Sequence, residues 1–159
     1  MKFIPLSITL IITIIALTLL TYKKTNSSEN KLCTSTLKYS INDEGLNFSH
    51  VTHYRLFLAE NGSGYVNLGG NVTYNNKNYI ISRIINFTYK PINQEGDYSS
   101  KIDEVMKTGQ DNIPDDLVNK FFIYTTLGVS NYFKVGRIDE HRMLISVSRG
   151  PFIVCSDSL

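Results

Sequence analysis

Two histidines three residues apart, His50 and His53, are of a residue type that often binds metal ions. They lie in a stretch where apolar and polar residues alternate, a pattern typical of a β-strand. On a strand an odd spacing sends two side chains to opposite faces, so this pair cannot chelate one ion. The spacing therefore predicts no metal site at these histidines.

A second candidate for chemistry is the acidic cluster Asp111, Asp115 and Asp116 in "GQDNIPDDLVNKFF". A calcium loop needs acidic residues at alternating positions, then a glycine and a distant glutamate, and this stretch lacks that order. Pro114 suits the first position of a helix, and Asp115 and Asp116 would then meet the positive end of the helix dipole. The segment is predicted to be one short helix with a structural N-terminus.

Motifs of the common catalytic sites are missing from the sequence. It contains no G-x-S-x-G, no phosphate-binding glycine loop and no nucleophile beside a plausible base, and His141 stands alone in a polar turn. A net charge of +2 with 19% charged residues does not indicate a nucleic-acid-binding surface. We expect a protein that is not an enzyme, carries no cofactor and does not bind nucleic acid directly.

One charged residue interrupts an apolar strand face in "YIISRIINFTYK". Tyr79, Ile85 and Phe87 share a face, and Arg83 lies in the middle of it. A buried guanidinium needs a carboxylate or carbonyl groups around it. Two interpretations stay open: an internal salt bridge, or a binding site. In the second, Arg83 would hold the acidic head of an amphipathic ligand while Tyr79, Ile85 and Phe87 contact its apolar body.

Cys33 and Cys155 are the two cysteines of the chain, and they lie near the two ends of its predicted folded part. Cytosolic proteins keep thiols reduced, whereas a pair that flanks a β domain behind a membrane anchor indicates a structural disulfide. The bond would join the first strand to the last and would place the domain outside the cytoplasm. Two unrelated buried thiols are the alternative.

The candidate residues above lie in a chain that is predicted to be mainly β. Apolar side chains recur with period two, and "ENGSG" and "YNNKNY" are typical of hairpin turns. Short turns between strands predict an antiparallel meander that closes toward a barrel or a sandwich, with one short helix and no second domain. The expected strands, about eight, cover residues 34–41, 46–58, 65–74, 79–90, 98–106, 132–138, 142–149 and 152–155.

The first 24 residues are predicted to be a transmembrane anchor. Residues 3–22 carry no charge, and twenty helical residues span about 30 Å, the thickness of a bilayer's hydrocarbon core. A cleaved signal peptide is the alternative, but it has a shorter apolar run and a small-residue cleavage site. Residues 25–31 are a polar tether, and residues 32–159 form the folded domain. By the positive-inside rule, the lysines on either side of the apolar run slightly favour a cytoplasmic location for the domain. The cysteine pair indicates a location outside the cytoplasm, and we give it more weight.

The anchor, Cys33, "SRIINFTYKP", "DNIPDDL" and "GPFIVC" together resemble the FidL-like family of enteric bacterial membrane proteins, over the whole chain. Members are typically encoded beside a membrane-bound transcription activator of the ToxR type and are similar in role to ToxS. The resemblance implies a single-pass inner-membrane protein with a periplasmic, lipocalin-like β-barrel. That barrel would pair with the activator's periplasmic domain, stabilise it and, in some relatives, help to sense amphipathic molecules such as bile salts. A periplasmic envelope chaperone or assembly factor without a DNA-binding partner is the alternative.

Overall fold

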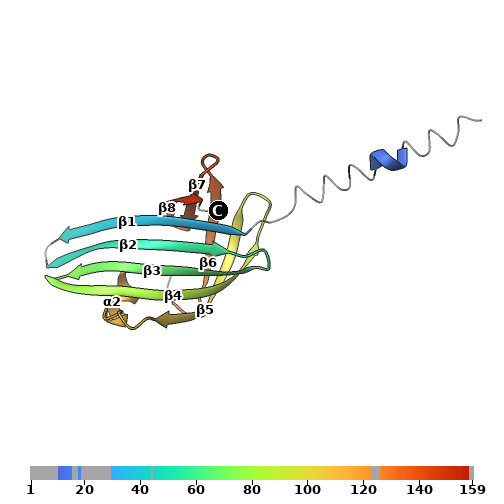
Figure 1. Ribbon diagram of the computed structural model, residues 1–159. Helices are drawn as coiled ribbons and strands as arrows, with labels where there is room; N and C mark the ends of the chain where they lie inside the picture. Colours follow the sequence, from blue (N-terminus) through green and yellow to red (C-terminus); the bar gives the residue numbers. More distant parts are fainter. Residues whose placement is uncertain (1–10, 16–17, 19–29, 44, 123–125, 158–159) are drawn as a thin grey trace, which may run out of the picture.

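A computed structural model describes residues 11–15, 18, 30–43, 45–122 and 126–157 of the chain (Figure 1). Its strands form a closed antiparallel barrel in which each strand pairs with its neighbours in the sequence. This order is that of an up-and-down barrel, so the mainly β, eight-stranded prediction is confirmed. The strands are β1 (Lys31–Asp43), β2 (Leu46–Leu58), β3 (Ser63–Tyr74), β4 (Lys77–Pro91), β5 (Asp97–Lys107), β6 (Ser130–Arg137), β7 (Arg142–Val147) and β8 (Gly150–Asp157).

The period-two pattern sets which side chains face the interior. On β2 the even-numbered residues from Phe48 to Leu58 point inward and are buried or half-buried, while odd-numbered His53 and Arg55 are exposed. The β3–β4 hairpin turns on Asn75 and Asn76, which have φ values of 46° and 64°. Asparagine tolerates this left-handed region better than most residues, which fixes the two-residue turn predicted from the sequence.

Strand length shapes the barrel. β1 to β4 have 12 to 15 residues, whereas β5 to β8 have 6 to 11. The long strands therefore run on past the short ones, and helix α2 (Asp115–Phe121) lies beside this extension (Figure 1). Phe121 of α2 stacks on Phe48 at 3.8 Å between ring centroids and contacts Tyr74 at 5.9 Å. The helix thus covers apolar side chains that the short strands leave without a partner.

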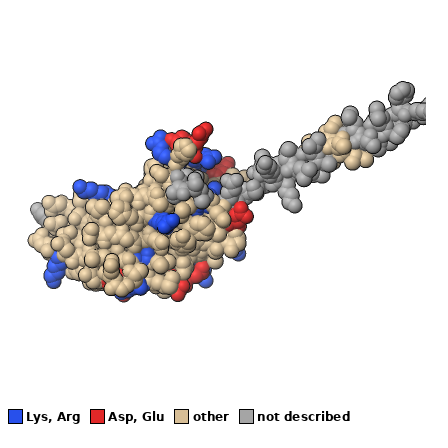
Figure 2. Space-filling view, viewed as in Figure 1, with Lys and Arg blue, Asp and Glu red and all other residues tan. Residues whose placement is uncertain are grey.

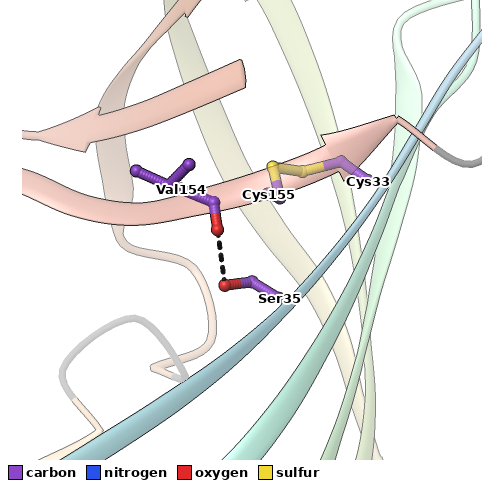
Figure 3. Close-up of a disulfide and its surroundings, with 4 residues drawn as sticks. All are labelled: Cys33, Ser35, Val154 and Cys155. Carbon is purple, nitrogen blue, oxygen red and sulfur yellow. Dashed lines mark hydrogen bonds between the residues drawn. A yellow bond between two sulfur atoms is a disulfide. The ribbon is translucent and has the colours of Figure 1, made fainter. Parts of the chain in front are cut away.

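The barrel closes at a narrow seam between β1 and β8. Only two residue pairs, Cys33–Asp157 and Thr34–Ser156, join these strands in the described part of the chain. A disulfide between Cys33 and Cys155 reinforces the seam, with 5.4 Å between the Cα atoms and 122 residues between the two positions. Next to it the hydroxyl of Ser35 donates a hydrogen bond of 2.7 Å to the carbonyl of Val154 (Figure 3). The predicted pairing of the cysteines is confirmed.

The predicted anchor (1–24) and tether (25–31) lie mostly outside the described residues. Residues 11–15 are helical, and the described part of the chain contains no helix with the length and apolar character needed to cross a membrane. β1 begins at Lys31, one residue before the predicted start of the folded domain.

Candidate functional site

The barrel encloses a cavity of about 450 Å³, which falls within the usual range of small-molecule sites. Side chains from all eight strands and from the C-terminal end of α2 line it, and most of them are apolar. The lining residues are Leu37, Tyr39, His50, Tyr54, Leu56, Val66, Leu68, Ile85, Phe87, Ser100, Ile102, Phe121, Phe122, Asn131, Tyr132, Phe133, Ile145, Val147, Arg149, Gly150, Pro151, Phe152 and Ile153.

The exposed members of this wall mark where the cavity opens. Tyr39 and Tyr132 are 47% and 56% exposed, and Arg149 and Pro151 in and after the β7–β8 turn are also exposed. Arg149 is the single charged residue among the described residues that line the cavity, and no ion pair of the described part of the chain includes it. An apolar chamber with one unpaired cation at its opening is suited to an amphipathic molecule.

The face of the molecule in Figure 2 carries no large patch of charge of one sign. On the face in Figure 2, uncharged residues cover most of the barrel, and lysine, arginine, aspartate and glutamate side chains are scattered between them. Nucleic-acid-binding domains gather lysine and arginine into a patch or stripe, and this face carries no such patch.

A short row of polar side chains on β2 lies in the mostly apolar interior. Thr52 is fully buried between His50 and Tyr54, and its hydroxyl lies 3.0 Å from Nδ1 of His50. Burial lowers the pKa of His50 below its ordinary 6.5. Burial also raises the pKa of Tyr54, and a hydrogen bond with Thr52 opposes that rise. The row is therefore uncharged near neutral pH.

His50 lies in contact with both this row and the end of the helix that covers the barrel. Its ring lies 5.0 Å from Phe122, 5.6 Å from Phe48 and 5.7 Å from Tyr39. None of these neighbours is a carboxylate, so a proton on His50 would bury an uncompensated charge at the contact with α2. His53, three residues along, points outward to Thr36 at 2.8 Å, as the odd spacing predicted.

Acid is expected to destabilise the fold through His50. Since the folded-state pKa lies below 6.5, the unfolded chain binds more protons as pH falls through 6.5, and the free energy of unfolding decreases. One proton limits this slope to about 1.4 kcal/mol per pH unit. Urea unfolding of the full-length protein on both sides of pH 6.5 would measure it. The variant His50→Leu should flatten that slope, whereas His53→Leu, on the outer face, should keep it. An equal slope in His50→Leu would contradict the assignment.

Arg83 lies inside the barrel, on the apolar face where the sequence placed it, and is 5% exposed. Its Nε donates to Oδ2 of Asp111 at 3.0 Å, and Nη2 donates to Oδ1 of Asp111 at 3.3 Å and to Asp115 at 2.8 Å. Lys107 also binds Asp115, at 2.9 Å. Hydrogen bonds from Lys107 and then from Arg83 hold the pKa of Asp115 below its ordinary value. The guanidinium is thus compensated by two carboxylates of the chain itself.

The loop after β5 brings Asp111 to Arg83. β5 ends at Lys107 while β4 continues, and residues 108–112 replace the missing strand. The amide of Ser82 donates to Oδ2 of Asp111 at 2.9 Å, and the amide of Ile80 donates to the side-chain oxygen of Asn112 at 2.7 Å. Side-chain oxygens therefore accept from β4 amides along the stretch of β4 that β5 leaves unpaired.

The structure separates the four residues of the predicted ligand site. Ile85 and Phe87 line the cavity, whereas Arg83 and Tyr79 are not among its lining residues. Arg83 forms the internal salt bridge that the sequence left open as one of its two interpretations. A second cation, Arg149, stands at the cavity instead. The sequence reasoning missed it because a single arginine in a turn, before "GPF", carries no periodic signal.

Helix α2 differs from its prediction in one detail. Pro114 is the N-cap, with φ −59° and ψ 141°, and the first helical residue is Asp115. The pyrrolidine ring allows this extended ψ, so the proline ends the loop and does not begin the helix. Asp115 and Asp116 do lie in the first turn, as expected.

The family comparison covers more than half of the 159 residues. The model of the family described as "FidL-like putative membrane protein" matches residues 70–155, from the middle of β3 to the second cysteine. A search of curated proteins finds no match. The matched region contains Arg83, Asp111, α2 and Arg149, and residues 1–69, which the sequence resemblance also took in, lie outside it. With its β-barrel and its Cys33–Cys155 disulfide, the chain belongs to the FidL-like family of membrane proteins.

Proposed function

We propose that this chain is a non-enzymatic accessory protein of the inner membrane, anchored by its apolar N-terminal segment with the barrel in the periplasm. The barrel would pair with the periplasmic domain of a ToxR-type activator and stabilise it. Family membership, the disulfide and the uncharged run of residues 3–22 support this location. Small amphipathic molecules would act on the activator through the barrel cavity.

The observation that carries the pairing is the open edge of β1. Past Thr34, β1 has β2 on one side and no strand on the other in the described part of the chain. An unpaired edge of this length is a template for a strand from another chain, since it offers a row of free backbone donors and acceptors. Leu37 and Ile41 are half-buried here and Tyr39 is 47% exposed, so an incoming strand would also cover apolar side chains.

Pairing is tested by co-purification from membranes. The full-length chain, tagged and expressed with a ToxR-type single-span activator of the same organism, is expected to retain that activator in mild detergent. Tyr39→Lys should reduce the retained amount severalfold, because a charged side chain at a strand edge opposes further pairing. Val51→Lys is the matched control, since Val51 is 39% exposed on β2, which already has strands on both sides.

Two results would contradict the proposal. Equal retention by Tyr39→Lys and the wild type would exclude the β1 edge as the contact. A wild-type chain that retains no activator, but retains unfolded envelope proteins, would favour the chaperone alternative.

A further inference from the structure

The wall of the cavity is apolar and irregular. β2 contributes His50, Tyr54 and Leu56 to it, and His50 and Leu56 lie six residue steps, about 20 Å, apart along the strand. Side chains from all eight strands and from the end of α2 form the rest of the wall. A flexible hydrocarbon chain can follow such a wall by rotating about its single bonds, whereas a rigid fused-ring body cannot. The cavity therefore favours a single flexible chain over a rigid steroid.

The polar groups of the wall fix which way such a chain would enter. A carboxylate beside His50 would lie among aromatic rings without a cation, which is a costly place for a charge. Arg149 is exposed at the opening and permanently charged, so a head group there keeps contact with water. Asn131 and Ser100, which also line the cavity, add hydrogen-bonding capacity.

We propose that the barrel cavity binds one single-chain, monoanionic amphipath of the fatty-acid class, with the tail among the apolar side chains and the carboxylate at Arg149. Arg149 would be a binding residue, and the Arg83–Asp111 pair would have no contact with the ligand. This site narrows the ligand class of the proposed function, and its physiological meaning rests on that function. Binding itself does not require the activator.

The absence of tryptophan from the chain allows a selective probe. Phe152→Trp places one indole in the cavity wall, in the full-length protein reconstituted in phosphatidylcholine vesicles. ω-Bromoundecanoate, a brominated fatty acid, is expected to quench its fluorescence saturably after correction for uptake by empty vesicles. If Phe152→Trp does not fold, as judged by its far-ultraviolet circular dichroism, Tyr132→Trp at the exposed rim replaces it with the same expectations.

Head-group recognition is tested with a matched neutral probe. All binding variants are made in the Phe152→Trp protein, which serves as their reference. Arg149→Gln should raise the half-saturating concentration of ω-bromoundecanoate about fivefold, the effect of losing one solvent-exposed charge pair. The same variant should leave ω-bromoundecanol within about twofold of its wild-type value. Arg55→Gln, an exposed arginine on the outer face of β2, should change neither probe.

Occupation of the cavity is tested by narrowing it. Ser100→Phe directs a ring into the wall from β5 and should weaken both probes about tenfold or more, since a filled bore excludes the tail. Ser99→Phe places the same ring on the opposite face of β5 and should bind both as the wild type does. Unlabelled dodecanoate should displace the probe at lower concentration than cholate.

Three outcomes would overturn the inference. The first is quenching that does not saturate once the empty-vesicle signal is subtracted. The second is an Arg149→Gln variant that binds ω-bromoundecanoate as its reference does. The third is displacement of the probe by cholate at or below the concentration at which dodecanoate displaces it. These three outcomes have no bearing on the co-purification experiment, which uses no amphipath. Loss of activator retention with intact quenching would, conversely, contradict the proposed function and leave this site standing.

Discussion

Replacing Cys33 and Cys155 together by alanine is expected to lower the free energy of unfolding by about 4–5 kcal/mol. The disulfide links positions 122 residues apart, and in the chain-entropy account a loop of this size removes that much conformational freedom from the unfolded chain. The native seam offers little to compensate for its loss, because β1 and β8 share two residue pairs and the Ser35–Val154 hydrogen bond. Both cysteines are buried, so alanine avoids introducing buried hydroxyls.

Urea unfolding of the full-length protein in detergent micelles would measure this loss. Reduced wild-type protein should unfold at the same urea concentration as the double variant. Ser35→Ala, which removes a single hydrogen bond at the same seam, should cost only about 1 kcal/mol. Two free thiols titrated in the native protein, or a double variant as stable as the oxidised wild type, would contradict the prediction.

The seam also connects stability with the cavity. β8 supplies the cavity wall from Gly150 to Ile153, and β1 supplies Leu37 and Tyr39. If these strands separate, the chamber opens to solvent and the free edge of β1 lengthens. Reduction is therefore expected to weaken amphipath binding before it disrupts the β1–β4 sheet, whose strands pair over most of their length.

The strands could be predicted because alternation is a local property. Each residue from Phe48 to Leu58 takes its face from its own position in the strand, and the Asn75–Asn76 turn is set by two adjacent residues. Arg83 was placed on the inner face for the same reason. The interior position of Arg83 follows from the alternation of side chains along β4 alone, without reference to any other element.

The partners of Arg83 and the cavity were not predictable in the same way. Asp111 lies 28 residues further along the chain, in a loop that meets β4 only because β5 stops early. The cavity depends on how side chains from eight strands fill the barrel, which no single segment encodes. The first residue of α2 could not be predicted either. The fixed φ of Pro114 is compatible with both the N-cap and the first helical position, so the proline alone does not tell which of the two it occupies.

Removing the carboxylate of Asp111 is expected to cost about 3–5 kcal/mol. The side chain of Asp111 has no exposed surface, and Arg83 is 5% exposed, so the variant Asp111→Ala would leave a buried guanidinium with one remaining partner. It would also leave the amide of Ser82 without its acceptor. Asp115→Ala is the matched control: Asp115 binds the same guanidinium but is 59% exposed, and its loss should cost less than about 1 kcal/mol.

A double-mutant cycle separates the pair from its surroundings. Arg83→Met alone should be strongly destabilising, because it leaves the Asp111 carboxylate buried without a cation. Arg83→Met combined with Asp111→Ala should be less destabilised than the sum of the two single variants by at least about 1 kcal/mol, since neither charge is then left alone. Additive free energies of unfolding would show that the two charges do not stabilise one another. Because neither residue lines the cavity, ω-bromoundecanoate should quench a folded double variant that also carries Phe152→Trp as it quenches Phe152→Trp alone. Loss of that quenching would return Arg83 to the ligand site.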